Sequence, residues 1–275
     1  MAGPVKTEAI VLRSLRYGEA DRILHLYTPQ RGRVSAIAKG VRRARSRFGG
    51  RLEPFFRLEL DLHEGRGELL TVTGAQTVEA YARLRTDARA LDAAARACDA
   101  VGRLFETGEP HPNVFNLLCR RLSLLDQGAG VNDASSMATD GRSSDLRSAS
   151  GFSGRAGALA FRLKLMLAAG LAPQLGACAD CGEREHLVGF SGASGGVVCG
   201  TCWPNTSGEQ TRSLGSFALD PDAYRFMTGA LGLPLAEAPG AGQQALGQVE
   251  RAISETLEHH AHVRLMPAAA AGTAG

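Results

Sequence analysis

Four of the six cysteines in the chain form two pairs with a spacing that is typical of a metal site. Two residues lie between Cys178 and Cys181, two lie between Cys199 and Cys202, and 17 residues separate the pairs. The short gap lets both thiolates of a pair turn towards one ion, and four thiolates complete the tetrahedral shell that Zn²⁺ prefers. The spacing therefore predicts a zinc finger over residues 178–202, with one structural zinc ion per chain.

The same cysteines could instead form two disulfide bonds or a redox-active dithiol. Both alternatives need an oxidising compartment or a thioredoxin-like βαβ context, and because neither is visible in the sequence, zinc is favoured. A zinc deaminase needs a His-x-Glu upstream of its cysteine pair, which is absent, and no Walker loop occurs. His259, His260 and His262 fit a solvated helix end better than a metal site. We therefore expect a protein without catalytic activity.

A second group of residues with binding chemistry is the basic run from Arg31 to Arg51, which contains no Asp or Glu. The chain holds 31 Lys and Arg against 28 Asp and Glu, and eight of those cations fall in this run, so the positive excess lies here. Unpaired cations are too costly to bury, so the run must face water or a polyanion. A solvated loop is the simpler interpretation of such a run.

Two further features of the basic run favour nucleic acid. Its glycines let the backbone approach a ligand closely, and Phe48 offers a ring on which a base can stack beside phosphate-binding arginines. Phosphate contacts do not distinguish DNA from RNA. The predicted DNA-binding residues are Arg31, Arg33, Lys39, Arg42, Arg43, Arg45, Arg47 and Phe48, and Arg51 is the eighth cation of the run.

The basic run lies within a region whose apolar residues recur with the period of β-strands. Leu58, Leu60 and Leu62, for example, alternate with charged residues, as expected of a half-buried strand. Five short antiparallel strands leave exposed edges, so closure into a small barrel of the OB type is the economical arrangement. The predicted strands cover residues 7–16, 21–27, 34–38, 56–63 and 69–78.

After residue 80 the apolar residues change to a helical period. Leu84, Leu91, Ala95, Cys98, Val101 and Phe105 are predicted to line the buried face of a helix over residues 81–107. Further helices are expected near residues 114–125, 159–169, 221–231 and 246–257. The predicted fold class is therefore α+β, with an OB-type barrel over residues 1–80 and an α-helical domain over residues 81–275 that carries the four-cysteine zinc finger.

The segment from residue 127 to residue 156 is rich in Gly, Ser, Ala and Asp and has almost nothing to bury, so we expect a flexible insertion there. The sequence also contains no run of 18 or more apolar residues and no recognisable signal peptide. These features predict a soluble, cytoplasmic protein with no membrane partner and no small-molecule substrate.

Two blocks of sequence resemble the RecO family of bacterial DNA repair and recombination mediators. Residues 7–55, TEAIVLRSLRYGEADRILHLYTPQRGRVSAIAKGVRRARSRFGGRLEPF, are similar to the N-terminal signature of that family along nearly their full length. The phrase LAAGLAPQLGACADCG, which leads into the first cysteine pair, resembles its second hallmark. The insertion at residues 127–156 has no expected counterpart in the family.

The resemblance implies an OB barrel, a helical domain interrupted by a zinc finger, and no enzymatic activity. It further implies binding to single- and double-stranded DNA, annealing of complementary strands, and loading of RecA on SSB-coated DNA together with RecR, at the bacterial nucleoid in the cytoplasm. A different class of function also fits the residues: a non-catalytic zinc-ribbon and OB protein that binds RNA or acts in regulation. Only the basic run separates these two alternatives.

Overall fold

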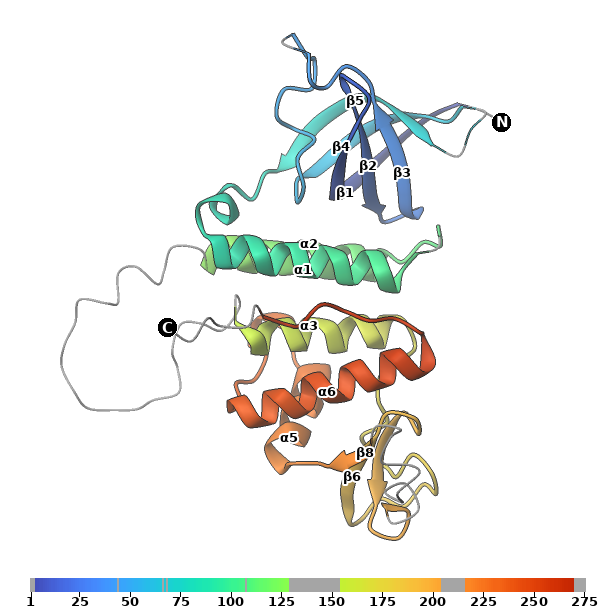
Figure 1. The fold of residues 1–275 in the computed structure, drawn as a ribbon, viewed down its shortest axis with the longest axis vertical. Coiled ribbons are helices and arrows are strands. Elements are labelled where there is room, and N and C mark those ends of the chain that lie inside the picture. Colours follow the sequence, from blue (N-terminus) through green and yellow to red (C-terminus); the bar gives the residue numbers. More distant parts are fainter. Residues whose placement is uncertain are drawn as a thin grey trace, which may run out of the picture. The chain divides into compact units, whose positions relative to one another are not determined.

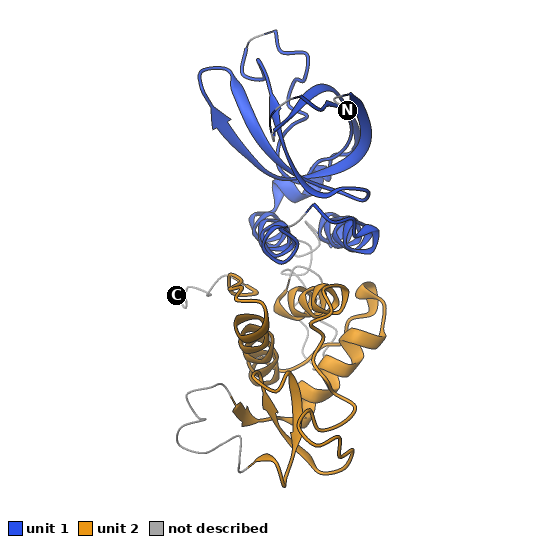
Figure 2. Cartoon of the chain, turned by 90° about the vertical axis from the view of Figure 1, so that its right-hand side faces the viewer, with its two compact units in different colours: residues 1–130 blue, residues 131–275 orange. Residues whose placement is uncertain are grey.

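The structure is a computed structural model that describes residues 3–43, 45–65, 67, 69–106, 108–128, 154–203 and 216–269. The chain divides into two compact units, residues 1–130 and 131–275, which are blue and orange in Figure 2. The first unit contains a β-barrel and helices α1 and α2, and the second contains helices and a small sheet (Figure 1). Within the described ranges, no helix is long and apolar enough to cross a membrane.

Five strands in the described part of the first unit close into a barrel in the order β1-β2-β3-β5-β4, which confirms the predicted OB-type fold. All neighbouring pairs are antiparallel except β3 and β5, which run parallel and pair at Ala36–Leu70 and Ile37–Thr71. The strands are β1 (Pro4–Tyr17), β2 (Asp21–Thr28), β3 (Gly32–Ala38), β4 (Arg57–His63) and β5 (Leu70–Glu79).

The interior of the barrel is filled by alternate residues of its strands, as the period of two requires. Leu58, Leu60 and Leu62 on β4 and Leu24 and Leu26 on β2 are all buried in one core cluster. Each inward leucine removes its side chain from water, and such burial stabilises a fold by about 1.5 to 3 kcal/mol per side chain. The barrel is thus a packed core that presents its polar residues outward.

Residues 39–56 connect β3 to β4 and must pass β5, because β5 lies between these two strands in the barrel. The connection is built of successive turns, and Phe48 and Leu52 insert into the barrel core. Two apolar side chains therefore fix the backbone of a segment that the sequence alone marks as highly charged.

The predicted single helix over residues 81–107 is a short 3-10 helix, η1 (Ala82–Thr86), followed by α1 (Ala88–Leu104). The chain breaks at Asp87, whose carboxylate accepts hydrogen bonds from the N–H groups of Arg89 at 2.8 Å and Ala90 at 3.1 Å. This break shifts the helical phase, so the prediction that Leu91 and Ala95 face inward is wrong and both are exposed. The buried face of α1 is formed mainly by alanines.

In helix α2 (Pro112–Gly128) the apolar period predicts an inward face of Val114, Leu117, Leu118, Leu122 and Leu125. All of these are buried except Leu117, which is half-buried. Helix α1 covers one end of the barrel's outer surface, where Tyr27 of β2 meets Phe105 edge to face at 6.3 Å. Cys98 on α1 is buried and Cys119 on α2 is half-buried. Burial raises the pKa of both thiols, that of Cys119 to about 11, so neither is a reactive thiolate.

The first described helix of the second unit is α3 (Arg155–Ala168), which ends in a glycine cap. Gly170 adopts φ 72°, and Leu171 donates a hydrogen bond back to Met166 at 2.8 Å. The carboxylate of Asp220 caps the next helix by accepting a hydrogen bond from the N–H of Asp222 at 2.7 Å. The remaining helices are α5 (Pro221–Gly232), η4 (Leu235–Glu237) and α6 (Gln243–His260).

A small antiparallel sheet in the second unit carries the cysteines. It consists of β6 (Leu187–Ser191), β7 (Gly196–Cys199) and β8 (Ser216–Ala218), in the order β7-β6-β8. The β6–β7 hairpin confirms the predicted ribbon, whereas β8 was not predicted because three residues are too few to show a period. Most of the predicted insertion at residues 127–156 lies outside the described residues.

Candidate metal centre and nucleic-acid interface

The side chains of Cys178, Cys181, Cys199 and Cys202 converge at one end of the β6–β7 hairpin, where their sulfur atoms all lie within 4.8 Å of one another. The Sγ atoms of Cys181 and Cys199 are 3.7 Å apart. Four sulfurs at about 2.3 Å from a tetrahedral zinc ion would be separated by about 3.8 Å. The four thiols can therefore hold a metal ion, and their chemistry and spacing fit an ion of this kind.

Tight turns bring the two cysteine pairs into this position. Gly182 directly follows Cys181, adopts φ 81° and donates a hydrogen bond to the carbonyl of Cys178 at 2.9 Å. A side chain at Gly182 would be strained in this conformation, which explains why a glycine stands at this bend. Cys199 is the last residue of β7, and its N–H donates to the sulfur of Cys178 at 3.3 Å.

The charge state of the cluster also suits a cation. Burial raises the pKa of Cys178, but hydrogen bonds from the backbone N–H groups of Cys181, Cys199 and Asp180 outweigh burial and bring it down to about 6. The pKa of Cys202 is raised, chiefly because its hydrogen bond with Cys181 stabilises the protonated thiol. A divalent cation would stabilise all four thiolates and release the protons that the metal-free cluster retains.

Helix α6 and Trp203 support the ribbon from two sides. Trp203 packs in a small apolar cluster with Leu187, Val198 and three of the cysteines, Cys178, Cys199 and Cys202. At the tip of the hairpin, the carbonyl of Gly192 lies 3.0 Å from Nε2 of His260 on α6. His260 therefore has a structural contact with the ribbon.

The ribbon itself is poor in positive charge. Over residues 178–203, all of which are described, Arg184 is the one Lys or Arg, against Asp180, Glu183 and Glu185. All four of these side chains are exposed. Because phosphate binding depends on Lys and Arg, the ribbon is not suited to hold a nucleic-acid backbone.

The barrel, in contrast, presents a dense cationic surface on the connection between β3 and β4. Within the described part of this connection, six exposed cations lie on 13 residues, and none is within ion-pair distance of a carboxylate in the described structure. We call this segment, residues 39–51, the basic segment. Its exposed cations are Lys39, Arg42, Arg43, Arg45, Arg47 and Arg51.

Arg31 and Arg33 differ from the other predicted DNA-binding cations because acidic side chains lie beside them. Arg31 is 3.4 Å from Glu64, and Arg33 is 3.6 Å from Glu106 and donates to the carbonyl of Gly102 at 2.8 Å. Arg33 thereby ties β3 to the end of α1. Both are only half-exposed, so Arg31 supports a contact within the barrel and Arg33 links the barrel to α1, and both add positive charge.

The structure corrects the expectation for Phe48, which was predicted to expose its ring. Phe48 is only 2% exposed and packs among the barrel leucines, with the guanidinium of Arg47 over its ring at 4.9 Å from the centroid. Burying an aromatic ring is more favourable than exposing it, and the open end of the barrel provides the space. In this conformation the ring is not available to a base.

Sequence reasoning missed polar residues on the outer face of β1, β2 and β3. Arg13 is exposed and pairs across strands with His25, whose Nδ1 lies 3.1 Å from the hydroxyl of Ser35. Burial and the positive charges of Arg33 and Arg13 lower the pKa of His25, so this imidazole is neutral at pH 7. The alternation of inward and outward residues along a strand could have placed Arg13, His25 and Ser35 on the outer face, because they alternate with the inward residues of the same strands.

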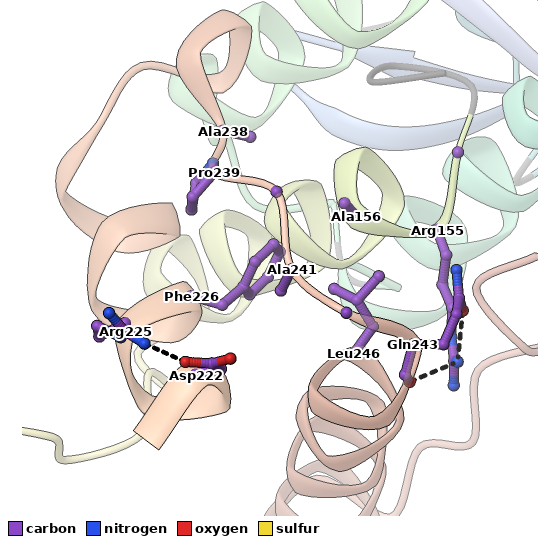
Figure 3. A pocket seen from close by; sticks show the side chains of 13 residues that line it. Arg155, Ala156, Asp222, Arg225, Phe226, Ala238, Pro239, Ala241, Gln243 and Leu246 are labelled. Atoms are coloured by element: carbon purple, nitrogen blue, oxygen red, sulfur yellow. Dashed lines mark hydrogen bonds and ion pairs between the residues drawn. The ribbon is translucent and has the colours of Figure 1, made fainter. Parts of the chain in front are cut away.

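A cavity of about 890 Å³ in the second unit lies between the start of α3, helix α5 and the start of α6 (Figure 3). Phe226, Leu246 and Ala156 give it an apolar lining. The arginines at its rim are already engaged: Arg225 pairs with Asp222, and Arg155 pairs with Glu250 at 2.7 Å. These charges are therefore neutralised locally and do not form a cationic surface for phosphates.

Comparisons with known proteins agree on one family. Residues 1–81 match the family model described as Recombination protein O N terminal, and residues 147–266 match Recombination protein O C terminal. A protein of Anaeromyxobacter sp. (strain K) is 35% identical over 95% of this chain and 93% of its own length. One of Rubrobacter xylanophilus is 37% identical over 98% of this chain and 97% of its own. Both relatives are named DNA repair protein RecO.

Proposed function

Because the chain belongs to the RecO family, as its sequence resemblance predicted, we propose that it is a DNA-binding recombination mediator in DNA repair. It binds single- and double-stranded DNA and anneals complementary strands. Together with RecR, it helps to load RecA on DNA that is coated with SSB. In this function the protein acts without catalysis, because strand pairing is downhill once the repulsion between phosphates is screened.

The observation that supports this proposal most strongly is the basic segment. Six exposed cations stand on the described part of a turn-rich connection, and none of them is within ion-pair distance of a carboxylate in the described structure. Such a surface attracts the phosphates of either strand without reading sequence, and it lowers the repulsion between two strands that it holds together. Both properties are those that an annealing protein needs.

The cysteine cluster holds one structural zinc ion in this proposal. All four ligand positions are filled by cysteines, so zinc would stabilise the ribbon without acting on a substrate. The ribbon carries more acidic than basic side chains, so its contribution to DNA binding is indirect. We propose that the barrel residues, and not the zinc finger, make the phosphate contacts.

Annealing of SSB-coated complementary strands, followed by fluorescence without ATP, tests the proposal. The wild-type protein should anneal these strands, and Arg43→Glu with Arg45→Glu should slow the reaction. The matched control is Arg83→Glu with Arg89→Glu, an equal change of charge on exposed residues of the same unit. The control variant should anneal as the wild type does.

The same assay distinguishes the finer parts of the proposal. If the protein acts through contact with SSB, removing the acidic C-terminal tail of SSB should suppress annealing of coated strands while naked strands still anneal. Equal rates with both forms of SSB would leave a generic cationic annealer. Failure on naked strands, combined with tight binding to RNA, would favour an RNA-binding or regulatory protein instead.

A further inference from the structure

Tyr17, the last residue of β1, is 53% exposed and is the only exposed Phe, Tyr or Trp in the described part of the chain. It stands immediately before a turn in which Gly18 adopts φ 55°. Aromatic residues elsewhere in the barrel and helices are buried or half-buried. An isolated exposed apolar side chain is common, so the argument for a function depends on what surrounds this ring.

The turn after Tyr17 is bound directly to the basic segment. The N–H of Gly40 donates to the carboxylate of Asp21 at 2.8 Å, and the N–H of Arg42 donates to the carbonyl of Ala20 at 3.0 Å. Asp21 is the cross-strand partner of Tyr17. Residues directly opposite on antiparallel strands have Cβ atoms about 5 Å apart. The exposed ring and the first cations of the basic segment therefore lie at the same end of the barrel.

The ring also continues the outer face of the sheet. Leu15 lies two residues before Tyr17 on β1, so the two side chains point to the same face of the sheet. Leu15 pairs with Ile23 of β2, and Ile23 pairs with Ile37 of β3, so these side chains lie on that face as well. All three are half-buried. Arg13 follows at the next position of the same row and is exposed. The face thus offers an aromatic ring, an apolar strip and a cation in succession.

We propose that Tyr17 is a stacking platform for one base of single-stranded DNA, whose phosphates lie on the basic segment and on Arg13. This assignment rests on the proposed DNA-binding function and adds a base contact to it. Stacking needs an unpaired base with a free face, so the contact is specific to single strands. The same turn also exposes Glu19, whose negative charge would repel phosphate. The turn can therefore contribute to DNA binding through the ring of Tyr17 and not through charge.

Binding of a short oligodeoxythymidylate and of an abasic strand of equal length tests this role. Tyr17→Ala should weaken binding to the thymidylate strand by roughly 5- to 100-fold, the usual effect of removing one base–aromatic stack. Wild type and Tyr17→Ala should bind the abasic strand equally, because that strand has no base to stack. The dependence of affinity on salt should be unchanged, since the substitution removes no charge.

Two matched variants complete the test. Tyr17→Phe keeps the ring and should bind both strands as the wild type does. Val78→Ala shortens another exposed apolar side chain of the barrel and should also have no effect. Equal affinity of Tyr17→Ala and wild type for thymidylate, or an equal loss on the abasic strand, would overturn the stacking role. If the wild type bound neither strand, the proposed DNA-binding function itself would fail.

Discussion

The indole ring of Trp203 lies against the backbone of Gly189, so closely that a Cβ atom at position 189 would overlap two of its carbon atoms. Trp203 follows the candidate metal ligand Cys202 and is the only tryptophan of the chain. Its fluorescence therefore reports on the ribbon alone, which separates the unfolding of this subdomain from events in the barrel.

Replacing Gly189 by Ala should destabilise the ribbon, because the indole ring must move to admit the methyl group. Overpacking of this kind costs about 1 to 3 kcal/mol. Denaturant unfolding followed by the fluorescence of Trp203 measures the change. Gly200→Ala is the control, since a Cβ atom there meets nothing within 4 Å and the backbone needs no positive φ. Equal midpoints for the two variants would contradict the packing described above.

We expect one zinc ion per chain in protein purified without added metal, and none in Cys181→Ala, because three thiolates form an incomplete structural site. Acidification should release the ion as the thiolates take up protons. Metal analysis, with Cys119→Ala as the control, checks both statements. DNA affinity of Cys181→Ala should stay close to that of the wild type. A loss of DNA binding in proportion to the loss of zinc, in protein with a folded barrel, would place the DNA site on the ribbon.

The salt dependence of DNA binding should show that the basic segment binds phosphates as a group. If about four cations contact a single strand, log K should fall against log salt with a slope of roughly −3. Arg43→Glu with Arg45→Glu should flatten this slope and weaken binding to all sequences alike. Titrations at several salt concentrations give the slope, and the variant with Glu at positions 83 and 89 serves as the reference. An unchanged slope would move the phosphate contacts to other arginines.

His25 should make the barrel sensitive to acid. Burial and the charges of Arg33 and Arg13 lower its pKa in the folded protein from the ordinary 6.5. As the pH is lowered, His25 therefore becomes protonated in the unfolded chain before it does in the folded protein. The contribution of His25 to the free energy of unfolding is complete above about pH 6.5 and is lost as the pH falls towards the folded pKa. His25→Gln cannot take up the proton. Its free energy of unfolding should fall less than that of the wild type between about pH 7.5 and 5.5, and parallel curves would show that His25 plays no part.

The barrel and the metal cluster could be predicted because each follows from a short-range pattern. Leu58, Leu60 and Leu62 alternate with charged residues, and Cys178 and Cys199 each begin a pair with the same two-residue gap. Such patterns depend on residues that are near in sequence. The strand period, the turn residues and the ligand spacing were therefore sufficient for the fold class and the four thiols.

The remaining features depend on contacts that local patterns do not contain. Phe48 lies among arginines in the sequence, but the open end of the barrel buries it. Leu91 is assigned to the buried face by counting a helical period from Leu84. Asp87 interrupts the helix between these two residues, so that count does not hold. The turn that follows Tyr17 is joined to the basic segment by hydrogen bonds between residues about 20 positions apart in the sequence. The packing of the barrel decides the first and the last of these cases, and the cap at Asp87 decides the second.

The burial of Phe48 and Leu52 has a consequence for the thermodynamics of binding. Ordering a flexible loop costs about 1 to 2 kcal/mol for each residue that becomes fixed, and a disordered basic loop would meet this cost when DNA binds. Here Phe48 and Leu52 already anchor the backbone next to them in the barrel core, so around these residues it is mainly the arginine side chains that lose freedom. Calorimetry should therefore show no large negative heat-capacity change of the kind that accompanies folding on binding. If the basic segment binds DNA as proposed, it does so as a preorganised surface.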